Sequence, residues 1–256
     1  MNKFNKKKFF YFEKKFFYSL LILVIFFLFF FYIYNNFYKL ENFIVNSVKK
    51  ISNELNYTLE YYDINDLNYI KHDNVVKSIQ PYINTSIFLL PLDEISKSIL
   101  ENTWVENLEL KTNYKNKIFI NIKEYEPIGI YYFNNNNYNF NSKGKIIDYI
   151  NSADKNISEF IIFTGQNSTI NALNLLNILK EIKKDFIKDI LKANYIKNRR
   201  WDLFLKGNIK LKLSEENLKK SIENYFKLII NLSHDDLINI KIIDLRDLQK
   251  AIIEYK

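Results

Sequence analysis

Residues 118–129 have the sequence IFINIKEYEPIG, and their pattern indicates the class of fold. Isoleucine recurs at every second position, and the residues between are Phe119, Asn121 and Lys123. An alternation with a period of two is typical of a strand that buries one face. Pro127 has no N–H to donate, so it marks a strand end or an edge position. Gly129 permits a bulge or the close approach of another backbone.

Four further elements are predicted upstream of this strand. Residues 59–64 form an aromatic-rich strand, and residues 104–111 form a half-buried strand because Leu108 and Leu110 alternate with polar residues. A first helix, capped by Asp73 and ended by Pro81, carries Val75, Val76, Ile79, Tyr82 and Ile83. A second helix starts at Asp93 and has on one face Leu92, Ile95, Ile99 and Leu100. The order strand–helix–helix–strand–strand predicts an antiparallel sheet with two helices on one face.

The N-terminal part predicts a membrane anchor. Residues 16–34 (FFYSLLILVIFFLFFFYIY) carry no charge, and nineteen helical residues span roughly 28 Å, close to the hydrocarbon thickness of a bilayer. Residues 1–15 hold six lysines and one glutamate, a net +5, which predicts a cytoplasmic N-terminus and contact of the Lys tail with membrane lipid. A cleavable signal peptide is the alternative, although its apolar region is usually shorter. Residues 35–56 are expected to be a juxtamembrane connector.

The composition excludes several classes of protein. The 256 residues include no Cys, two His and four Gly, so disulfides, a thiolate metal site, a zinc site and a Gly-rich phosphate loop are not expected. Residues 16–256 carry only +3 of the total +8, which argues against a nucleic-acid partner. Ser233-His234-Asp235-Asp236 is expected to be a solvated turn, and Glu124 is expected to be structural or solvated. We predict no catalytic residue, metal, cofactor or small-molecule substrate.

The part of the chain after Gly129 is predicted to be rich in strands. Residues 128–165 have short strands and turns, including the turn Asn141-Ser142-Lys143-Gly144 and the loop tip 134–137. A helix follows, with Leu175, Leu176, Leu179, Ile182, Phe186, Ile190 and Leu191 at helical spacing. Residues 199–213 form a hairpin that turns at Gly207. Ser214 is expected to cap a helix that buries Leu218, Ile222, Tyr225, Phe226, Ile229 and Ile230.

Arginine is the rarest basic residue in this chain. Against 34 lysines there are only three arginines, at 199, 200 and 246. A planar guanidinium forms paired hydrogen bonds that lysine does not reproduce. These arginines either pair within the fold, with Asp244 or Asp247, or present their guanidinium groups to carboxylates of a partner.

Several of these segments together resemble the FtsQ/DivIB family of bacterial cell-division proteins. Residues 118–129 resemble the family's I-x-V-x-E-x-x-P-x-A strand, with Glu124 and Pro127 at the matching positions. Residues 199–213 resemble its R-x-W-x-L-x-L-x-x-G-x-x-I-x-L hairpin, and residues 244–246 its D-[LV]-R strand. The resemblance covers residues 16–256 in order.

The resemblance implies an α+β fold with a defined order of domains. A cytoplasmic tail (1–15), a transmembrane helix (16–34) and a connector (35–56) are followed by a POTRA domain (57–126) of β-α-α-β-β order. Residues 127–256 then form a β-rich domain with two or more helices.

The resemblance also implies a function. The chain is expected to be a non-enzymatic, single-pass scaffold of the bacterial inner membrane, with its outer domains in the periplasm, found at the division septum. It is expected to bind FtsB/FtsL-type partners and to link them to the FtsW/FtsI-type pair that synthesises septal wall. The implied partner-binding residues are Arg199, Arg200, Trp201, Arg246, Asp247, Leu248, Ala251, Ile252 and Ile253, of which residues 247–253 supply a strand edge. The alternative is a POTRA-bearing translocation or outer-membrane assembly factor.

Overall fold

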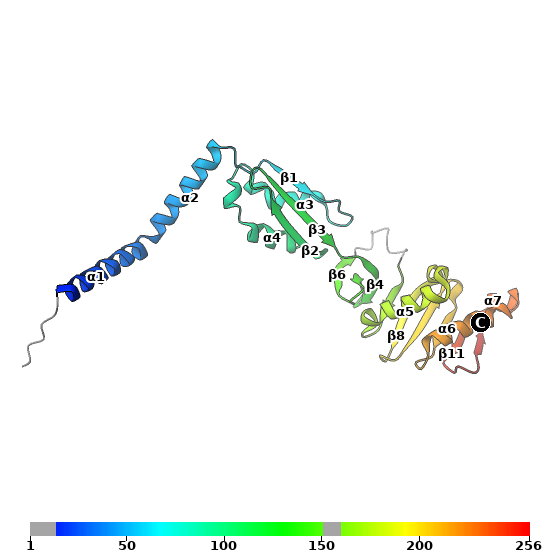
Figure 1. The fold of residues 1–256 in the computed structure, drawn as a ribbon. Coiled ribbons are helices and arrows are strands. Elements are labelled where there is room, and N and C mark those ends of the chain that lie inside the picture. The colour runs from blue at the N-terminus through cyan, green and yellow to red at the C-terminus, as the bar shows by residue number, and fades with distance from the viewer. Residues whose placement is uncertain (1–13, 151–159) are drawn as a thin grey trace, which may run out of the picture. The chain divides into compact units, whose positions relative to one another are not determined.

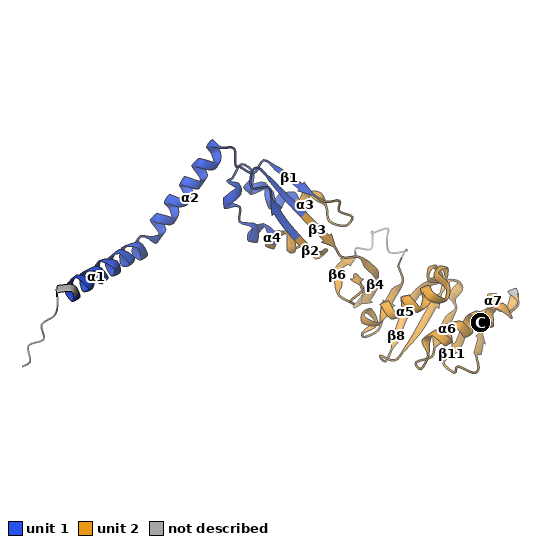
Figure 2. Ribbon diagram, in the orientation of Figure 1, with its two compact units in different colours: residues 1–64, 76–96, 109–120 blue, residues 65–75, 97–108, 121–256 orange. Residues whose placement is uncertain are grey.

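The computed structural model describes residues 14–150 and 160–256 (Figure 1). The Lys-rich tail therefore lies outside the described residues, except for the two lysines that begin the first helix. Figure 2 shows two compact units, residues 1–64, 76–96 and 109–120 and residues 65–75, 97–108 and 121–256. The domain boundaries given above remain predictions.

The N-terminal helices are α1 (Lys14–Asn35) and α2 (Phe37–Glu54). Within the described residues, one helix is long and apolar enough to cross a membrane, and the qualifying window is Phe16–Asn35. The expected connector is largely helical. At its C-terminal end α2 is tied to the following region, because the hydroxyls of Ser52 and Ser86 lie 2.7 Å apart in a buried hydrogen bond.

The next region has the predicted order of strands and helices. It consists of β1 (Tyr61–Ile64), α3 (His72–Ile79), α4 (Leu92–Leu100), β2 (Val105–Thr112) and β3 (Lys117–Glu124), with short 3₁₀ turns at Gln80–Tyr82 and Ile87–Leu89. The sheet order is β1-β3-β2. The alternation along β3 is confirmed, since Ile118, Ile120 and Ile122 are buried and the residues between them are exposed.

Three predictions for this region were wrong. The sheet is not fully antiparallel, because β1 pairs with β3 in parallel, and the helical crossover between them supplies the long connection that parallel strands need. Asp73 lies in the first turn of α3 and is not its cap, since the helix begins at His72. Leu100 is exposed at the last position of α4.

Glu124 has a structural role at the end of β3. Its Oε1 accepts hydrogen bonds from the backbone N–H groups of Tyr69 (2.9 Å) and Ile70 (2.7 Å), and its Oε2 accepts one from Asn68 (2.7 Å). The carboxylate therefore holds the loop that leads into α3.

The C-terminal region is a nine-stranded mixed sheet in the order β12-β11-β10-β9-β8-β7-β4-β5-β6. Its strands are β4 (Pro127–Phe133), β5 (Asn136–Asn141), β6 (Ile146–Ile150), β7 (Ile162–Thr164), β8 (Ile190–Ile196), β9 (Arg200–Leu205), β10 (Lys210–Leu213), β11 (Ile240–Leu245) and β12 (Ile252–Tyr255). The neighbours β4–β7, β7–β8 and β10–β11 are parallel. Pro127 begins β4, and a register shift lies between Pro127 and Gly129, as expected.

Helices cover this sheet and complete its core. The helix α5 (Ser168–Lys183) packs on β4 and β7, and α6 (Leu218–Ile230) packs on β10 and β11 and against α5. The short helix α7 (His234–Asn239) precedes β11. The core cluster includes Phe140, Phe163, Leu175, Leu179, Trp201, Leu203, Leu211, Ile222, Ile243 and Leu245.

Several expectations for this region were also wrong. Ile190 and Leu191 lie in β8, because a 3₁₀ segment (Lys184–Asp189) ends the helix before them. Asn217, not Ser214, caps α6 by accepting the N–H of Lys220. Ile230 is exposed. The segment 233–236 begins a helix: Ser233 and Asp236 form a capping box for α7.

Asparagine provides most of the left-handed backbone in the turns. Among the described residues, nine non-glycine residues have a positive φ, and seven of them are asparagines: Asn56, Asn84, Asn134, Asn135, Asn167, Asn198 and Asn208. Asparagine tolerates this conformation better than other non-glycine residues. Gly207 lies where the β9–β10 hairpin turns, with φ +79°. The predicted turn at this glycine is therefore confirmed.

Candidate partner-binding site

A tight turn positions the first two arginines. Lys197 (φ 49°) and Asn198 (φ 56°) connect β8 to β9, and the N–H of Arg199 donates to the carbonyl of Ile196 at 3.0 Å. Two successive residues with positive φ match the right-handed twist of a hairpin. Arg199 therefore lies at the tip of the hairpin, and Arg200 begins β9.

The neighbouring Trp201 has a different place. Its side chain is only 3% exposed, and its ring contacts the rings of Phe163 and Tyr195. Because side chains alternate along a strand, burial of Trp201 turns Arg200 to the other face. The tryptophan thus anchors the hairpin in the core, while the side chain of Arg199 is 57% exposed and that of Arg200 is 20% exposed.

The third arginine follows β11 and is paired within the fold. The Nη2 of Arg246 lies 2.7 Å from Oδ2 of Asp244, and its Nε donates to Oδ1 at 2.8 Å. Burial opposes ionisation of Asp244, but the hydrogen bonds and charge of Arg246, with the charge of Lys212, outweigh it and lower the pKa of this carboxyl. The bond to Asp244 in turn raises the pKa of Arg246. The intramolecular pairing considered from the sequence is therefore present.

Strand register aligns a row of charged residues across β9, β10 and β11. Lys212 faces Asp202 on one side and Asp244 on the other. Asp202 is nearly fully buried, and its carboxylate lies 2.9 Å from Nζ of Lys210 and 3.4 Å from Nε of Arg200. This row holds the start of β9 and the end of β11 in register, which brings the hairpin arginines close to Arg246.

The three arginines line one polar pocket of about 290 Å³. Its other lining residues are Ser214, Glu215 and Glu216, from the loop between β10 and α6. Arg199 reaches Glu215 with an Nε–Oε2 distance of 3.4 Å, and both side chains are about half exposed. The arginines were predicted from the sequence, whereas the acidic residues were not, because their only signal is their position directly after the hairpin.

The residues predicted to supply a strand edge are divided between a loop and a strand. Ile252 and Ile253 belong to β12, which pairs antiparallel with β11 through Asp244↔Ile252 and Ile243↔Ile253. β12 is the last strand in the order of the described sheet. Asp247, Leu248 and Ala251 lie in the loop before it.

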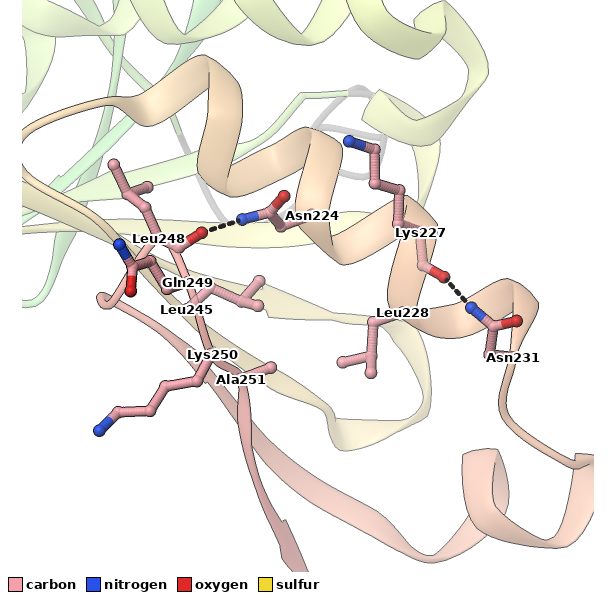
Figure 3. A pocket seen from close by; sticks show the side chains of 9 residues that line it. All are labelled: Asn224, Lys227, Leu228, Asn231, Leu245, Leu248, Gln249, Lys250 and Ala251. Carbon is pink, nitrogen blue, oxygen red and sulfur yellow. Dashed lines mark hydrogen bonds between the residues drawn. The ribbon is translucent and has the colours of Figure 1, made fainter.

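This loop forms a second pocket with α6, of about 280 Å³ (Figure 3). The side-chain amide of Asn224 donates to the carbonyl of Leu248 at 3.0 Å and ties the loop to the helix. The apolar lining residues are Leu228, Leu245, Leu248 and Ala251, and the polar ones are Asn224, Lys227, Asn231, Gln249 and Lys250. Sequence analysis did not identify this pocket, because its two walls come from segments separated by α7 and β11.

No candidate metal centre competes with this site in residues 14–150 and 160–256. No group of three or more His, Cys, Asp or Glu side chains is arranged to hold a metal ion there. Guanidinium groups gathered in one polar pocket suit binding of a carboxylate.

Comparisons with known proteins match both outer regions. Residues 58–125 match the family profile described as "POTRA domain, FtsQ-type", and residues 130–246 match "Cell division protein FtsQ/DivIB, C-terminal". The second match lies outside the POTRA region, and this is the part that distinguishes division proteins from the translocation or assembly factors considered as the alternative.

Curated relatives agree with these matches. The chain is similar to the cell division protein FtsQ of Rickettsia typhi, at 30% identity over 83% of this chain and 78% of the relative. It is also similar to the cell division protein DivIB of Clostridium tetani, at 26% identity over 68% of this chain and 70% of the relative.

A solved structure, the major extracytoplasmic domain of the division protein DivIB from Geobacillus stearothermophilus, is similar at 12% identity with a TM-score of 0.31. The match covers 43% of this chain and 99% of that domain. The two profile matches and the 30% identity to an FtsQ suffice: the chain belongs to the FtsQ/DivIB family of cell-division proteins.

Proposed function

We propose that this protein is a bitopic scaffold of the bacterial inner membrane that recruits FtsB/FtsL-type partners to the division septum. Its N-terminus is cytoplasmic and its outer domains are periplasmic. The family is non-enzymatic, so binding is the activity that the site has to explain. The bound partners connect the scaffold to an FtsW/FtsI-type synthase pair. The observation that carries the proposal is the gathering of all three arginines in one pocket, with Arg246 directly after β11, the strand that pairs with β12.

The arginines differ in how easily they exchange partners. Arg199 and Glu215 form a half-exposed pair with a 3.4 Å separation, and such surface pairs contribute at most about 1 kcal/mol. A partner carboxylate therefore displaces Glu215 at little cost. Arg246 is held firmly by Asp244 through Nε and Nη2, which leaves its Nη1 for a further acceptor. Arg246 thus offers a pre-oriented donor, and Arg199 offers a mobile one.

Strand β12 supplies the second part of the site. A partner segment that adds to its outer edge gains main-chain hydrogen bonds, and its alternate side chains find pockets. The pocket of Figure 3 lies beside the loop that leads into β12 and has four apolar lining residues. It can receive one apolar side chain of the added segment. Loop residues Leu248 and Ala251 then take part through this pocket, and Ile252 and Ile253 through the strand.

Charge reversal tests the arginine pocket. We expect Arg199→Glu and Arg246→Glu to weaken co-purification with an FtsB-type partner by at least about tenfold, because each places a carboxylate where the partner's carboxylate binds. The matched control is Lys188→Glu, which makes the same charge change at an exposed ion pair with Asp185. Thermal melting identifies any variant that has lost its fold. Unchanged co-purification by both folded arginine variants would refute the docking proposal.

Cross-linking tests the strand edge. The chain has no cysteine, so Ile252→Cys, at a position 61% exposed, provides a single thiol on β12. A cysteine scan through the partner segment should form disulfides at every second position, the period of a paired strand. Cross-links without that period contradict strand addition.

Localisation in the cell tests the division role independently of the binding site. A fluorescent fusion should form a band at midcell, and an even distribution around the envelope argues against a division role.

A further inference from the structure

Helix α2, the helix that follows α1 in Figure 1, has an exposed apolar stripe. The stripe consists of Phe37, Leu40, Ile44 and Ile51 with the C-cap residue Leu55, and their exposed fractions range from 45% to 60%. At about 100° per residue, these five side chains fall within about 60° of arc. The stripe carries no charge over five helical turns.

The opposite face of α2 is polar. Its exposed residues are Lys39, Asn42, Asn46, Lys49, Lys50 and Asn53. A flanking face carries the half-buried Val45 and Val48 and the buried Ser52, whose hydroxyl bonds to Ser86. The stripe therefore faces neither the outer region to which the helix is tied nor the polar side.

The position of α2 in the chain points to the surface that covers this stripe. Only Asn36 separates it from α1, whose apolar window Phe16–Asn35 has 20 residues. Twenty helical residues rise about 30 Å, which uses the full hydrocarbon thickness of a bilayer. The first turn of α2 therefore begins at the membrane boundary. Tyr38, in the first turn of α2, is exposed, and tyrosine is enriched at this boundary.

The spacing of the stripe distinguishes a lipid surface from a partner helix. A two-stranded coiled coil needs apolar residues in a 3.5-residue repeat, which places Phe37, Ile44 and Ile51 at one set of core positions. The other set is then Leu40, Ser47 and Glu54 in one frame, or Glu41, Val48 and Leu55 in the other, so both frames place a glutamate in the seam. The stripe follows the 3.6-residue period of a straight helix instead, as suits a helix lying on a flat surface.

We infer that α2 lies on the outer leaflet of the membrane that α1 crosses, with the stripe at the boundary between headgroups and acyl chains. Such a helix binds lipid through its apolar area, while its lysines remain in the headgroup layer. The inference rests on the transmembrane role of α1 in the proposed function. It adds a second contact with the bilayer, which limits how freely the outer region swings about its anchor.

The full chain can test this, because it contains no cysteine. Single-cysteine variants at stripe positions Ile44→Cys and Ile51→Cys, and at the polar positions Asn46→Cys and Asn53→Cys, are labelled with a bimane fluorophore. They are reconstituted alone into vesicles of phosphatidylethanolamine and phosphatidylglycerol. All four positions are exposed, so the fold tolerates the label. Quenching by iodide reports exposure to water, and quenching by doxyl-labelled lipid reports contact with acyl chains.

We expect the two stripe positions to be quenched by doxyl lipid and to be at least about fivefold less accessible to iodide than the two polar positions. Equal iodide access at all four positions overturns the inference, because the stripe is then bare in water and awaits a protein partner. Protection from iodide without doxyl quenching, increasing with the protein-to-lipid ratio, also overturns it and indicates a second copy of the chain.

A label at Leu28→Cys, in the middle of α1, separates this inference from the proposed function. Protection at Leu28 together with water access at the stripe refutes only the position of α2. Water access at Leu28 refutes the anchor itself.

Discussion

The carboxylate of Glu124 joins the end of β3 to the loop before α3, and its removal tests whether three backbone hydrogen bonds hold that loop. The acceptor distances are 2.7 to 2.9 Å, and the donors belong to three consecutive residues, Asn68, Tyr69 and Ile70. Glu124→Ala removes all three acceptors. Glu124→Gln keeps one oxygen and turns an N–H₂ group toward a donor, so it should have a smaller effect of the same kind.

The expected magnitude depends on which donors water can reach. A hydrogen bond to a charged acceptor contributes about 1.5–3 kcal/mol. The bonds from Asn68 and Tyr69 are exposed, so water replaces most of their contribution, whereas the bond from Ile70 is partly buried. We therefore expect Glu124→Ala to lower the free energy of opening of this loop by about 2 kcal/mol. That change corresponds to about thirtyfold faster amide exchange.

Hydrogen–deuterium exchange measured by mass spectrometry reports the opening of the loop directly, in a peptide that covers residues 65–71. The control is Glu126→Ala, which removes an exposed carboxylate two residues away. Exchange of this peptide at the wild-type rate in Glu124→Ala would show that the three bonds do not limit opening. Exchange that is faster throughout the protein would show that the effect is global unfolding and not release of the loop.

Further predictions concern two glycines and two titrating groups. Gly165→Ala should destabilise the fold by more than about 3 kcal/mol, because φ is +97° and the new Cβ would lie 2.2 Å from a backbone oxygen of β8. Gly207→Ala, with φ +79° but open space around it, should cost only about 1–2 kcal/mol; urea unfolding followed by tryptophan fluorescence compares the two. The pKa of Asp244 is lowered because bonds from Arg246 outweigh burial, so this pair stabilises the fold above about pH 4 and is lost as pH falls below that. Arg246→Gln should therefore lower the urea midpoint at pH 7, with a difference from wild type that shrinks in acid, and a constant difference contradicts this. Burial raises the pKa of Tyr225 from 10.0 to about 12, so the neutral phenol stabilises the fold below pH 10, and that contribution disappears as pH rises toward 12. Tyr225→Phe should lose less stability than wild type between pH 10 and pH 12, and parallel losses would show that this phenol is not responsible.

The features that sequence alone predicted well are those set by local period or by a single turn residue. The alternation along β3 requires one buried face whatever the strand pairs with, and it was confirmed. The β9–β10 hairpin was predictable because Gly207 falls between two alternating segments. The apolar helix α1 was equally clear, since its run of residues has no polar face.

The errors arose where pairing partners distant in sequence decide the structure. Ile190 and Leu191 fit the helical spacing of α5, but β8 forms because both β7 and β9 are available to pair with it. The parallel pairing of β1 with β3 likewise depends on the path of the helical crossover. A sequence pattern predicts which residues share one face of a helix or strand. It does not predict which other elements pack or pair with that element.

The residues of the candidate site also differ in how far they could be predicted from the sequence. The three arginines stood out because arginine is rare in this chain, and the structure places them in one pocket. The acidic residues Glu215 and Glu216 carried no such signal among 29 carboxylates. The sequence also left open whether Arg246 pairs within the fold. Its bond to Asp244 depends on where β11 ends, which no local pattern specifies.

The asparagine-rich turns have an evolutionary consequence. Glycine codons are rich in G and C, whereas asparagine codons are rich in A and T, so a mutational bias toward A and T favours asparagine over glycine. In residues 14–150 and 160–256, seven of nine left-handed non-glycine positions are asparagines, and the whole chain has only four glycines. Asparagine tolerates the same backbone conformation at a small cost, so a lineage can lose most of its glycines without losing its strand ends. At Gly165 the exchange is prevented twice, because φ is +97° and a Cβ would meet the backbone oxygen of Tyr195.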